Sequence, residues 1–134
     1  AAGRVDVVGL DDPHIGAASP EQVDWSALHA PVPLRLGVVH APYVGVLDHF
    51  AGAGFDLTLA GHTHGGQVRV PGIGALVDNC DLPLRMARGL SRFDDRMWLH
   101  VSAGLGTSRF APVRFACRPE VSVLDLVPRP APPL

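Results

Sequence analysis

The segment that decides the fold spans residues 34–66 and reads LRLGVVHAPYVGVLDHFAGAGFDLTLAGHTHGG. Its first six residues form an apolar run of a length that suits a buried strand, and this strand ends at His40. Apolar residues at three- and four-residue spacing then predict an amphipathic helix over 43–53, closed by glycines. A second strand is predicted over 55–60. Such strand–helix–strand order indicates an α/β fold.

Two more histidines, His62 and His64, follow the second strand. They are one residue apart, so in extended backbone both imidazoles project to the same side, and the glycines around them permit tight turns. Ligand sites in open α/β sheets lie at the carboxyl ends of the strands, where His40 also stands. These three imidazoles predict a metal site with open positions for water or substrate.

Two alternatives compete with this metal site. The histidines would be ordinary polar loop residues if the short motif arose by chance. A cupin also has a His-x-His pair, but it expects a Glu three or four residues after the second His, where Gln67 and Val68 stand here. The cupin alternative is therefore disfavoured.

The remaining segments read as short units separated by Gly and Pro. Arg4 to Leu10 predicts a strand, and Ser19, with Gln22 three residues later, predicts a capped helix that ends before Pro31. The β-rich second half is predicted from four short apolar pieces: Val68 to Val70, Met97 to Ser102, Val113 to Cys117 and Val121 to Val127. Residues 128–134 predict a Pro-rich tail that is disordered or extended.

The composition is that of a single folded unit. The 134 residues are 47% hydrophobic, and 11 Lys+Arg against 13 Asp+Glu leave no basic stripe for nucleic acid. Cys80 and Cys117 match neither a metal-type pair nor a disulfide framework, so we expect two unlinked thiols. No stretch approaches the ~20 apolar residues of a membrane helix, so we expect a soluble chain without a membrane segment.

Several stretches resemble one family. Residues 61–67, Gly-His-Thr-His-Gly-Gly-Gln, resemble the GHTHGGQ signature of bacterial calcineurin-like metallophosphoesterases, and residues 40–42 resemble the His-x-Pro segment that precedes it. Residues 104–106, 113–115 and 117–121 resemble the C-terminal end of the same domain. The branch of the family that they resemble includes membrane-associated and lipid-directed phosphoesterases. The resemblance covers roughly residues 5 to 127 and implies that residues 1–127 are the C-terminal portion of a metallophosphoesterase domain.

The resemblance implies both a fold and a reaction. The fold would be part of a two-sheet sandwich flanked by helices, with a β-rich C-terminal half. His40 and His62 would bind one metal of a dinuclear pair, and His64 the other. Two divalent ions, Mn, Fe or Zn, would activate water to hydrolyse a phosphomonoester or phosphodiester in a phosphorylated small molecule or lipid. The resemblance to the membrane-associated branch of the family would also imply that the parent protein is associated with a membrane or the cell envelope.

This sequence also departs from the family. The family uses Asp-x-His, Gly-Asp and Gly-Asn-His segments upstream, and the last two are absent here. Three imidazoles alone do not hold two ions in a working pair, so we expect half a site, no activity from this chain alone, and an N-terminal half of the same domain as partner. The catalytic proton donor stays unassigned. The alternative is a non-catalytic metal-binding or interaction module derived from such a domain.

Asp12-Pro13-His14 allows two interpretations. It spells the family's first metal segment, but Gly9 to Pro13 is better explained as the family's Gly-x-Asp-Asp loop near the substrate mouth. In that interpretation His14 contacts substrate, and Gly65 and Gly66 are further candidates because their backbone can approach phosphate oxygens.

The other histidines and two arginines have simpler explanations. His29 and His49 lie in or beside predicted helices and are expected to be solvated, whereas His100 is expected to be a strand residue. Arg109 and Arg114 have the chemistry to bind phosphate, but exposed Arg is common, so neither is assigned to it.

Overall fold

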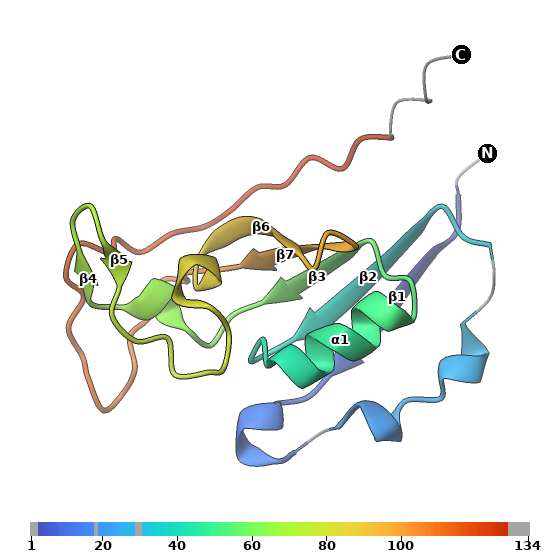
Figure 1. Cartoon of the computed structure of the whole chain (residues 1–134), viewed down its shortest axis with the longest axis horizontal. Coiled ribbons are helices and arrows are strands. Elements are labelled where there is room, and N and C mark those ends of the chain that lie inside the picture. The colour runs from blue at the N-terminus through green and yellow to red at the C-terminus, as the bar shows by residue number, and fades with distance from the viewer. Residues whose placement is uncertain (1–2, 18, 29–30, 129–134) are drawn as a thin grey trace.

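The computed structural model describes residues 3–17, 19–28 and 31–128, so the predictions for His29 and for residues 129–134 lie outside the described residues. Its centre is a five-stranded sheet (Figure 1). The strands, in spatial order, are β1 (Val5–Leu10), β2 (Leu34–Val39), β3 (Leu57–Ala60), β7 (Met97–Val101) and β6 (Gly89–Phe93). The first four are parallel to one another, and β6 pairs antiparallel with β7 at the edge.

The predicted helix is confirmed as α1 (Val44–Gly52), which packs on one face of the sheet (Figure 1). Leu47 and Phe50 of α1 are fully buried, and they belong to the same core cluster as Met97, Leu99 and Val101 of β7, which are also fully buried. The helix approaches β2 closely at Gly37, where a Cβ would lie 3.1 Å from Phe50 Cδ2. Alternate residues of β2, β3 and β7 therefore form one core with α1.

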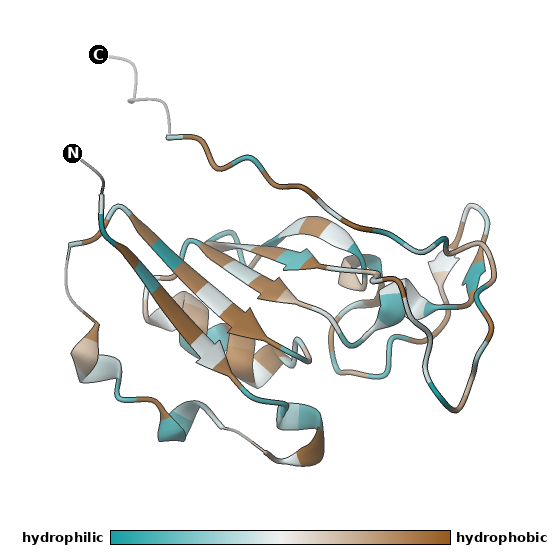
Figure 2. Cartoon of the chain, turned by 180° about the vertical axis from the view of Figure 1, so that it is seen from behind, coloured by the Kyte–Doolittle hydropathy of each residue, from teal (hydrophilic) through white to brown (hydrophobic). Residues whose placement is uncertain are grey.

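The opposite face of the sheet is apolar and largely uncovered. Figure 2 shows brown strands in front of α1 in the view from behind. Because strand residues alternate between faces, Val7, Val38 and Trp98 share this side, and they are 61%, 41% and 42% exposed. The described residues therefore form a layered structure with a helix on one side of the sheet only.

The continuous helix predicted between Ser19 and Pro31 is wrong for the described residues. They form two short 3-10 turns, η2 (Pro20–Gln22) and η3 (Trp25–Ala27). The Ser19 amide does donate to the Gln22 side chain, at 3.0 Å, but Val23 is extended and ends the turn. β-branched residues favour that conformation, and Trp25 is then free to pack edge-on against Phe50.

The second half differs in part from prediction. Strands over 68–70 and 97–102 are confirmed as β4 (Arg69–Val70) and β7, whereas the described residues of 113–117 and 121–127 form no strand. Phe115 makes one isolated bridge with Val68. Two strands were not predicted. One is β6, and the other is β5 (Gly74–Ala75), which pairs with β4. An apolar segment becomes a strand only where a partner edge is within reach, and that is decided by tertiary packing.

The fold class is confirmed. The described residues form a mixed α/β structure with one five-stranded sheet and one small antiparallel sheet, consistent with part of a calcineurin-like phosphoesterase fold. The remaining 3-10 turns are η1 (Pro13–Ile15), η4 (His64–Gly66) and η5 (Leu84–Met86). No helix in the described part of the chain is long and apolar enough to cross a bilayer.

Candidate metal centre

The parallel strands β2 and β3 bring two of the three predicted histidine ligands together. The Gly61 amide donates to the His40 carbonyl at 2.9 Å, which ties the two strand ends side by side. His40 Nε2 then lies 3.2 Å from His62 Nδ1, and the two rings meet edge to face with centroids 5.1 Å apart. The predicted convergence at the carboxyl edge of the sheet therefore holds for this pair.

The hydrogen bonds of His62 decide which of its nitrogens faces His40 as an acceptor. His62 Nε2 lies 3.1 Å from the Asn79 carbonyl oxygen, which only accepts, so Nε2 carries the hydrogen. Neutral His62 therefore presents the Nδ1 lone pair toward His40. Two nitrogen ligands of one ion, each at ~2.1 Å, lie about 3 Å apart, so this pair matches two corners of a metal coordination shell.

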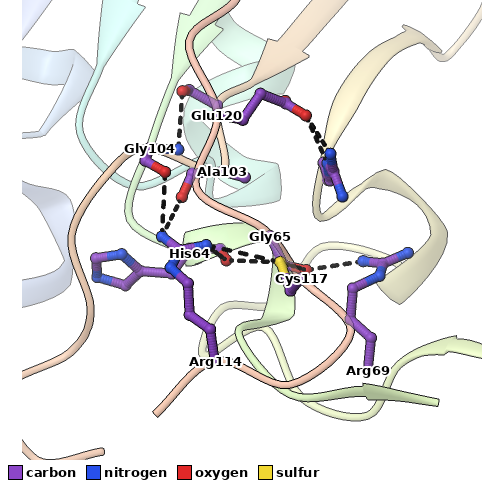
Figure 3. Close-up of polar contacts among 10 residues, drawn as sticks. His64, Gly65, Arg69, Ala103, Gly104, Arg114, Cys117 and Glu120 are labelled. Atoms are coloured by element: carbon purple, nitrogen blue, oxygen red, sulfur yellow. Dashed lines mark hydrogen bonds and ion pairs between the residues drawn. The ribbon is translucent and has the colours of Figure 1, made fainter. Parts of the chain in front are cut away.

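His64 is placed differently from this pair. It lies in η4 and points its backbone carbonyl toward Arg114 (Figure 3). Within residues 3–17, 19–28 and 31–128, no three His, Cys, Asp or Glu side chains form a group ready to hold a metal ion. The described residues thus fit part of a metal site and do not form a complete one.

The environment keeps two of these imidazoles neutral. Burial lowers the pKa of His62, and nearby His14 and His40 act in the same direction, against the raising effect of the Asn79 carbonyl. Burial also lowers the pKa of His64, as does the positive charge of Arg114. Neutral imidazole is the form that ligates a metal, so both side chains are held in the ligating state near neutral pH.

The segment Asp12-Pro13-His14 lies directly against the pair. The His14 ring is 4.5 Å from that of His62, centroid to centroid, and Asp12 Oδ2 is 3.8 Å from His40 Nε2. Asp12 also accepts from the His14 amide at 2.9 Å, which starts η1 and fixes the two side chains relative to each other. This contact is compatible with both sequence interpretations of the segment.

Tyr43 is a site residue that sequence reasoning missed. Its hydroxyl lies 2.6 Å from His14 Nδ1, and burial raises the pKa of the phenol. Its only sequence signal was its place three residues after His40, at the start of α1. The contact depends on the path of the loop after β1, which the sequence alone does not define.

The loop that follows β3 has an unusual backbone. His62, His64 and Gln67 all have positive φ, at 64°, 49° and 40°. Non-glycine residues in this region are strained by roughly 1–3 kcal/mol each, and such strain collects at functional sites. The strain must be offset by contacts around the loop, such as the Thr63 hydroxyl, which donates to the Ala87 carbonyl at 2.8 Å.

Gly65 and Gly66 are buried inside this loop. A Cβ on Gly66 would lie 2.3 Å from the Cβ of Ala75, so only glycine fits there. The Gly65 amide donates to the Thr63 hydroxyl at 3.2 Å, and the Gly66 amide donates to the Thr63 carbonyl at 2.8 Å. Both amides are thus used within the loop, and their contact with substrate stays a prediction.

Two cavities flank the histidines and share the segment 76–79. One, of about 640 Å³, is lined by His14 and Tyr43. The other, of about 510 Å³, lies beside His62 and His64 and is largely apolar, with Val68 and Phe110 in its wall. The site therefore has space on both sides of the histidines.

The remaining histidines, the cysteines and Arg109 have other surroundings. His49 is on α1, with Nδ1 2.8 Å from the Gly45 carbonyl, and His100 is buried within β7. Cys80 and Cys117 are free thiols, as predicted. The Arg109 guanidinium lies over the ring of Phe110.

Comparison with known proteins finds two relatives among bacterial phosphoesterases. The chain is similar to phosphodiesterase YaeI of Escherichia coli (strain K12), with 42% identity over 76 residues, which is 54% of this chain and 26% of YaeI. It is also similar to the uncharacterized metallophosphoesterase YkoQ of Bacillus subtilis (strain 168), with 31% identity over 123 residues, 91% of this chain and 43% of YkoQ. The chain thus spans less than half the length of either relative. No family model and no solved structure matches it.

The names of both relatives refer to phosphoester hydrolysis, and the name of YkoQ also refers to a metal.

Proposed function

We propose that this chain forms the histidine-bearing edge of a phosphoesterase site, in a protein that hydrolyses a phosphomonoester or phosphodiester. The observation that carries the proposal is the 3.2 Å approach of His40 Nε2 to His62 Nδ1 where two parallel strands end. The similarity to YaeI and YkoQ supports the same class of reaction. In this proposal residues 1–127 act as one portion of a larger catalytic domain.

The proposed metal ligands are His40, His62 and His64. His40 and His62 face each other already, and His64 lies two residues further along the same loop. When bound, two divalent ions of Mn, Fe or Zn would lower the pKa of a shared water and neutralise phosphate oxygens. The other ligands would come from outside the described residues.

The hydrogen-bonded pair of His14 and Tyr43 is proposed to bind the substrate. Whichever of the two donates in their 2.6 Å contact, the other is left with an outward-facing donor: His14 Nε2–H in one case and the Tyr43 hydroxyl in the other. The pair therefore offers one donor to a phosphate oxygen beside His62. Nothing in this role requires either side chain to change its protonation.

The apolar cavity beside His62 and His64 is proposed to take the organic part of the substrate. Leu76 and Phe110 in its wall are 53% and 83% exposed, so they present apolar surface without covering the histidines. This suits a phosphorylated small molecule or a lipid, whose apolar portion gains by leaving water.

Metal content and phosphodiester hydrolysis test the proposal together. This chain and a longer form that includes the preceding half of the domain are purified, each with His62→Ala and, as a matched control, His49→Ala on the exposed side of α1. We expect the longer form to bind two ions and to hydrolyse bis(p-nitrophenyl) phosphate, and His62→Ala alone to abolish both. Absence of metal and of turnover from both wild-type forms would contradict the proposal.

One outcome supports the second candidate function. If both forms bind metal through His62 and neither hydrolyses any phosphoester, the chain is a non-catalytic metal-binding module.

A further inference from the structure

The side chain of Arg114 is enclosed by backbone carbonyls beside the histidine loop (Figure 3). Its Nη2 donates to the Ala103 carbonyl at 2.6 Å and to the Gly104 carbonyl at 3.2 Å. Its Nε donates to the Gly106 carbonyl at 2.9 Å, and its Nη1 donates to the His64 carbonyl at 3.2 Å. One guanidinium therefore joins two loops that follow neighbouring strands, β3 and β7.

This contact set leaves Arg114 little capacity to bind substrate. A guanidinium has five N–H donors in a fixed planar fork, and each of its three nitrogens already donates to a carbonyl. Charge-assisted hydrogen bonds of this kind are roughly twice as strong as neutral ones, so exchanging them for a phosphate would leave loop carbonyls unpaired. The geometry favours a role in holding the loops over direct phosphate binding.

The contact acts on a strained residue. His64 has φ of 49°, and its carbonyl is held by Arg114 and also by the Cys117 thiol, which donates at 3.4 Å. The carbonyl direction fixes the peptide plane after His64, and with it the path of the backbone that carries the imidazole. Behind the same loop, a Cβ on Gly65 would lie 3.0 Å from Cys117 Sγ, so the C-terminal segment is packed against it.

We propose that Arg114 is a positioning residue, which holds the His64 peptide in its left-handed conformation and so aims the His64 imidazole. This proposal rests on the proposed function at one point, because the proposed function makes His64 a metal ligand. A lysine cannot replace this arginine, because one ammonium group cannot reach four carbonyls that lie around a planar fork.

The test is NMR spectroscopy of the labelled 134-residue chain. The variants are Arg114→Lys, which keeps the charge, and Arg118→Gln, which removes a charge from an exposed position in the same segment. We expect Arg114→Lys to shift or broaden the His64 imidazole and the Gly65 and Gly66 amide signals. Arg118→Gln should leave all of them in place, and the His49 imidazole should be unchanged in both variants.

A measurement on the wild-type chain covers the case in which Arg114→Lys does not fold. If the guanidinium is held by carbonyls, the Arg114 Nε–H signal should be protected from exchange with water, while that of Arg118 should exchange fast. A rapidly exchanging Arg114 Nε–H, or unchanged His64, Gly65 and Gly66 signals in folded Arg114→Lys, would overturn the positioning role.

Titration of the same samples with Zn²⁺ separates this inference from the proposed function. If Zn²⁺ moves no histidine signal in either the wild-type chain or the wild-type longer form, the proposed metal edge fails, whereas the dependence of the His64 signals on Arg114 can still be observed. If Zn²⁺ moves the His40 and His62 signals equally in wild type and Arg114→Lys, and the His64 response is lost only in the variant, both proposals are supported.

Discussion

At the scale of single residues, the loop after β3 combines strain with close packing. Three non-glycine residues adopt positive φ there, and so do Gly65 and Gly66, which lie between His64 and Gln67. These conformations cost free energy locally, so contacts with distant segments of the chain must stabilise them. Substitutions in this loop should therefore affect stability more than similar substitutions in open turns.

Gly66 and Gly72 form a matched pair for this expectation. Their φ values are 75° and 81°, but a Cβ on Gly66 would meet Ala75, whereas one on Gly72 would meet nothing within 4 Å. Gly72→Ala should lower the free energy of unfolding by about 1–2 kcal/mol, because alanine is strained in the left-handed conformation. Gly66→Ala should cost roughly 1–3 kcal/mol more because the site becomes overpacked. Urea denaturation measures both, and equal losses would contradict the crowding at Gly66.

Cys80 should react slowly with alkylating agents although it is partly exposed. Burial raises the pKa of its thiol to about 11, and the nearby Asp78 acts in the same direction. Only the thiolate reacts, so at pH 8 roughly one thiol in a thousand would be reactive. Mass spectrometry of iodoacetamide labelling should show a rate that rises about tenfold per pH unit up to pH 10. Labelling at pH 8 as fast as that of a free cysteine peptide would contradict this.

At the scale of elements, α1 receives its N-terminal cap from a distant part of the chain. Its own N-cap residue, Tyr43, makes no side-chain capping hydrogen bond. Instead, Asp81 Oδ1 accepts from the Val44 amide at 2.8 Å. A carboxylate at this position also interacts favourably with the helix dipole. The segment 76–82, of which residues 76–79 line both cavities, is thereby attached to the helix that follows His40.

Removal of this cap should destabilise the chain. Asp81→Ala leaves the Val44 amide without its acceptor, and we expect a loss of about 1 kcal/mol in the free energy of unfolding. Asp81→Asn retains an acceptor oxygen and should lose less. Thermal and urea unfolding, followed by circular dichroism, compare the two. Equal losses for Ala and Asn would assign the effect to charge and not to the hydrogen bond.

At the scale of the whole molecule, the C-terminal segment is held against the core through a few contacts. Arg88 forms an ion pair with Glu120, and the Glu120 amide donates to the Gly104 carbonyl at 3.0 Å. The hydrogen bond and charge of Arg88 lower the pKa of Glu120 below its usual value of 4.5. This attachment places Arg114 and Cys117 behind the histidine loop, so the segment supports the site although it forms no strand among the described residues.

The ion pair should make stability depend on pH. Because the folded-state pKa of Glu120 is depressed, its contribution is fully present above about pH 4.5 and is lost as the pH falls through the folded-state value. Both partners are partly exposed, so we expect Glu120→Gln to cost about 1 kcal/mol or less near pH 7. The difference from wild type should shrink toward roughly pH 3. A difference that does not change with pH would contradict this account.

Sequence periodicity by itself determined the central unit of this protein. The strand at 34–39, the helix at 43–53 and the strand before Gly61 were predicted because apolar spacing of this kind is local. The meeting of His40 and His62 followed from the rule that parallel strands end at the same edge. The unpaired state of the two cysteines was also predicted from their spacing alone.

Only the tertiary structure decided the surroundings of that unit. The contact of Tyr43 with His14 spans 29 residues, and the contact of Arg114 with His64 spans 50. Such contacts depend on loop paths and on backbone conformations with positive φ, which no local pattern encodes. The strand predicted at 121–127 did not form and β6 did, because strand formation depends on the availability of a partner edge as well as on apolar alternation.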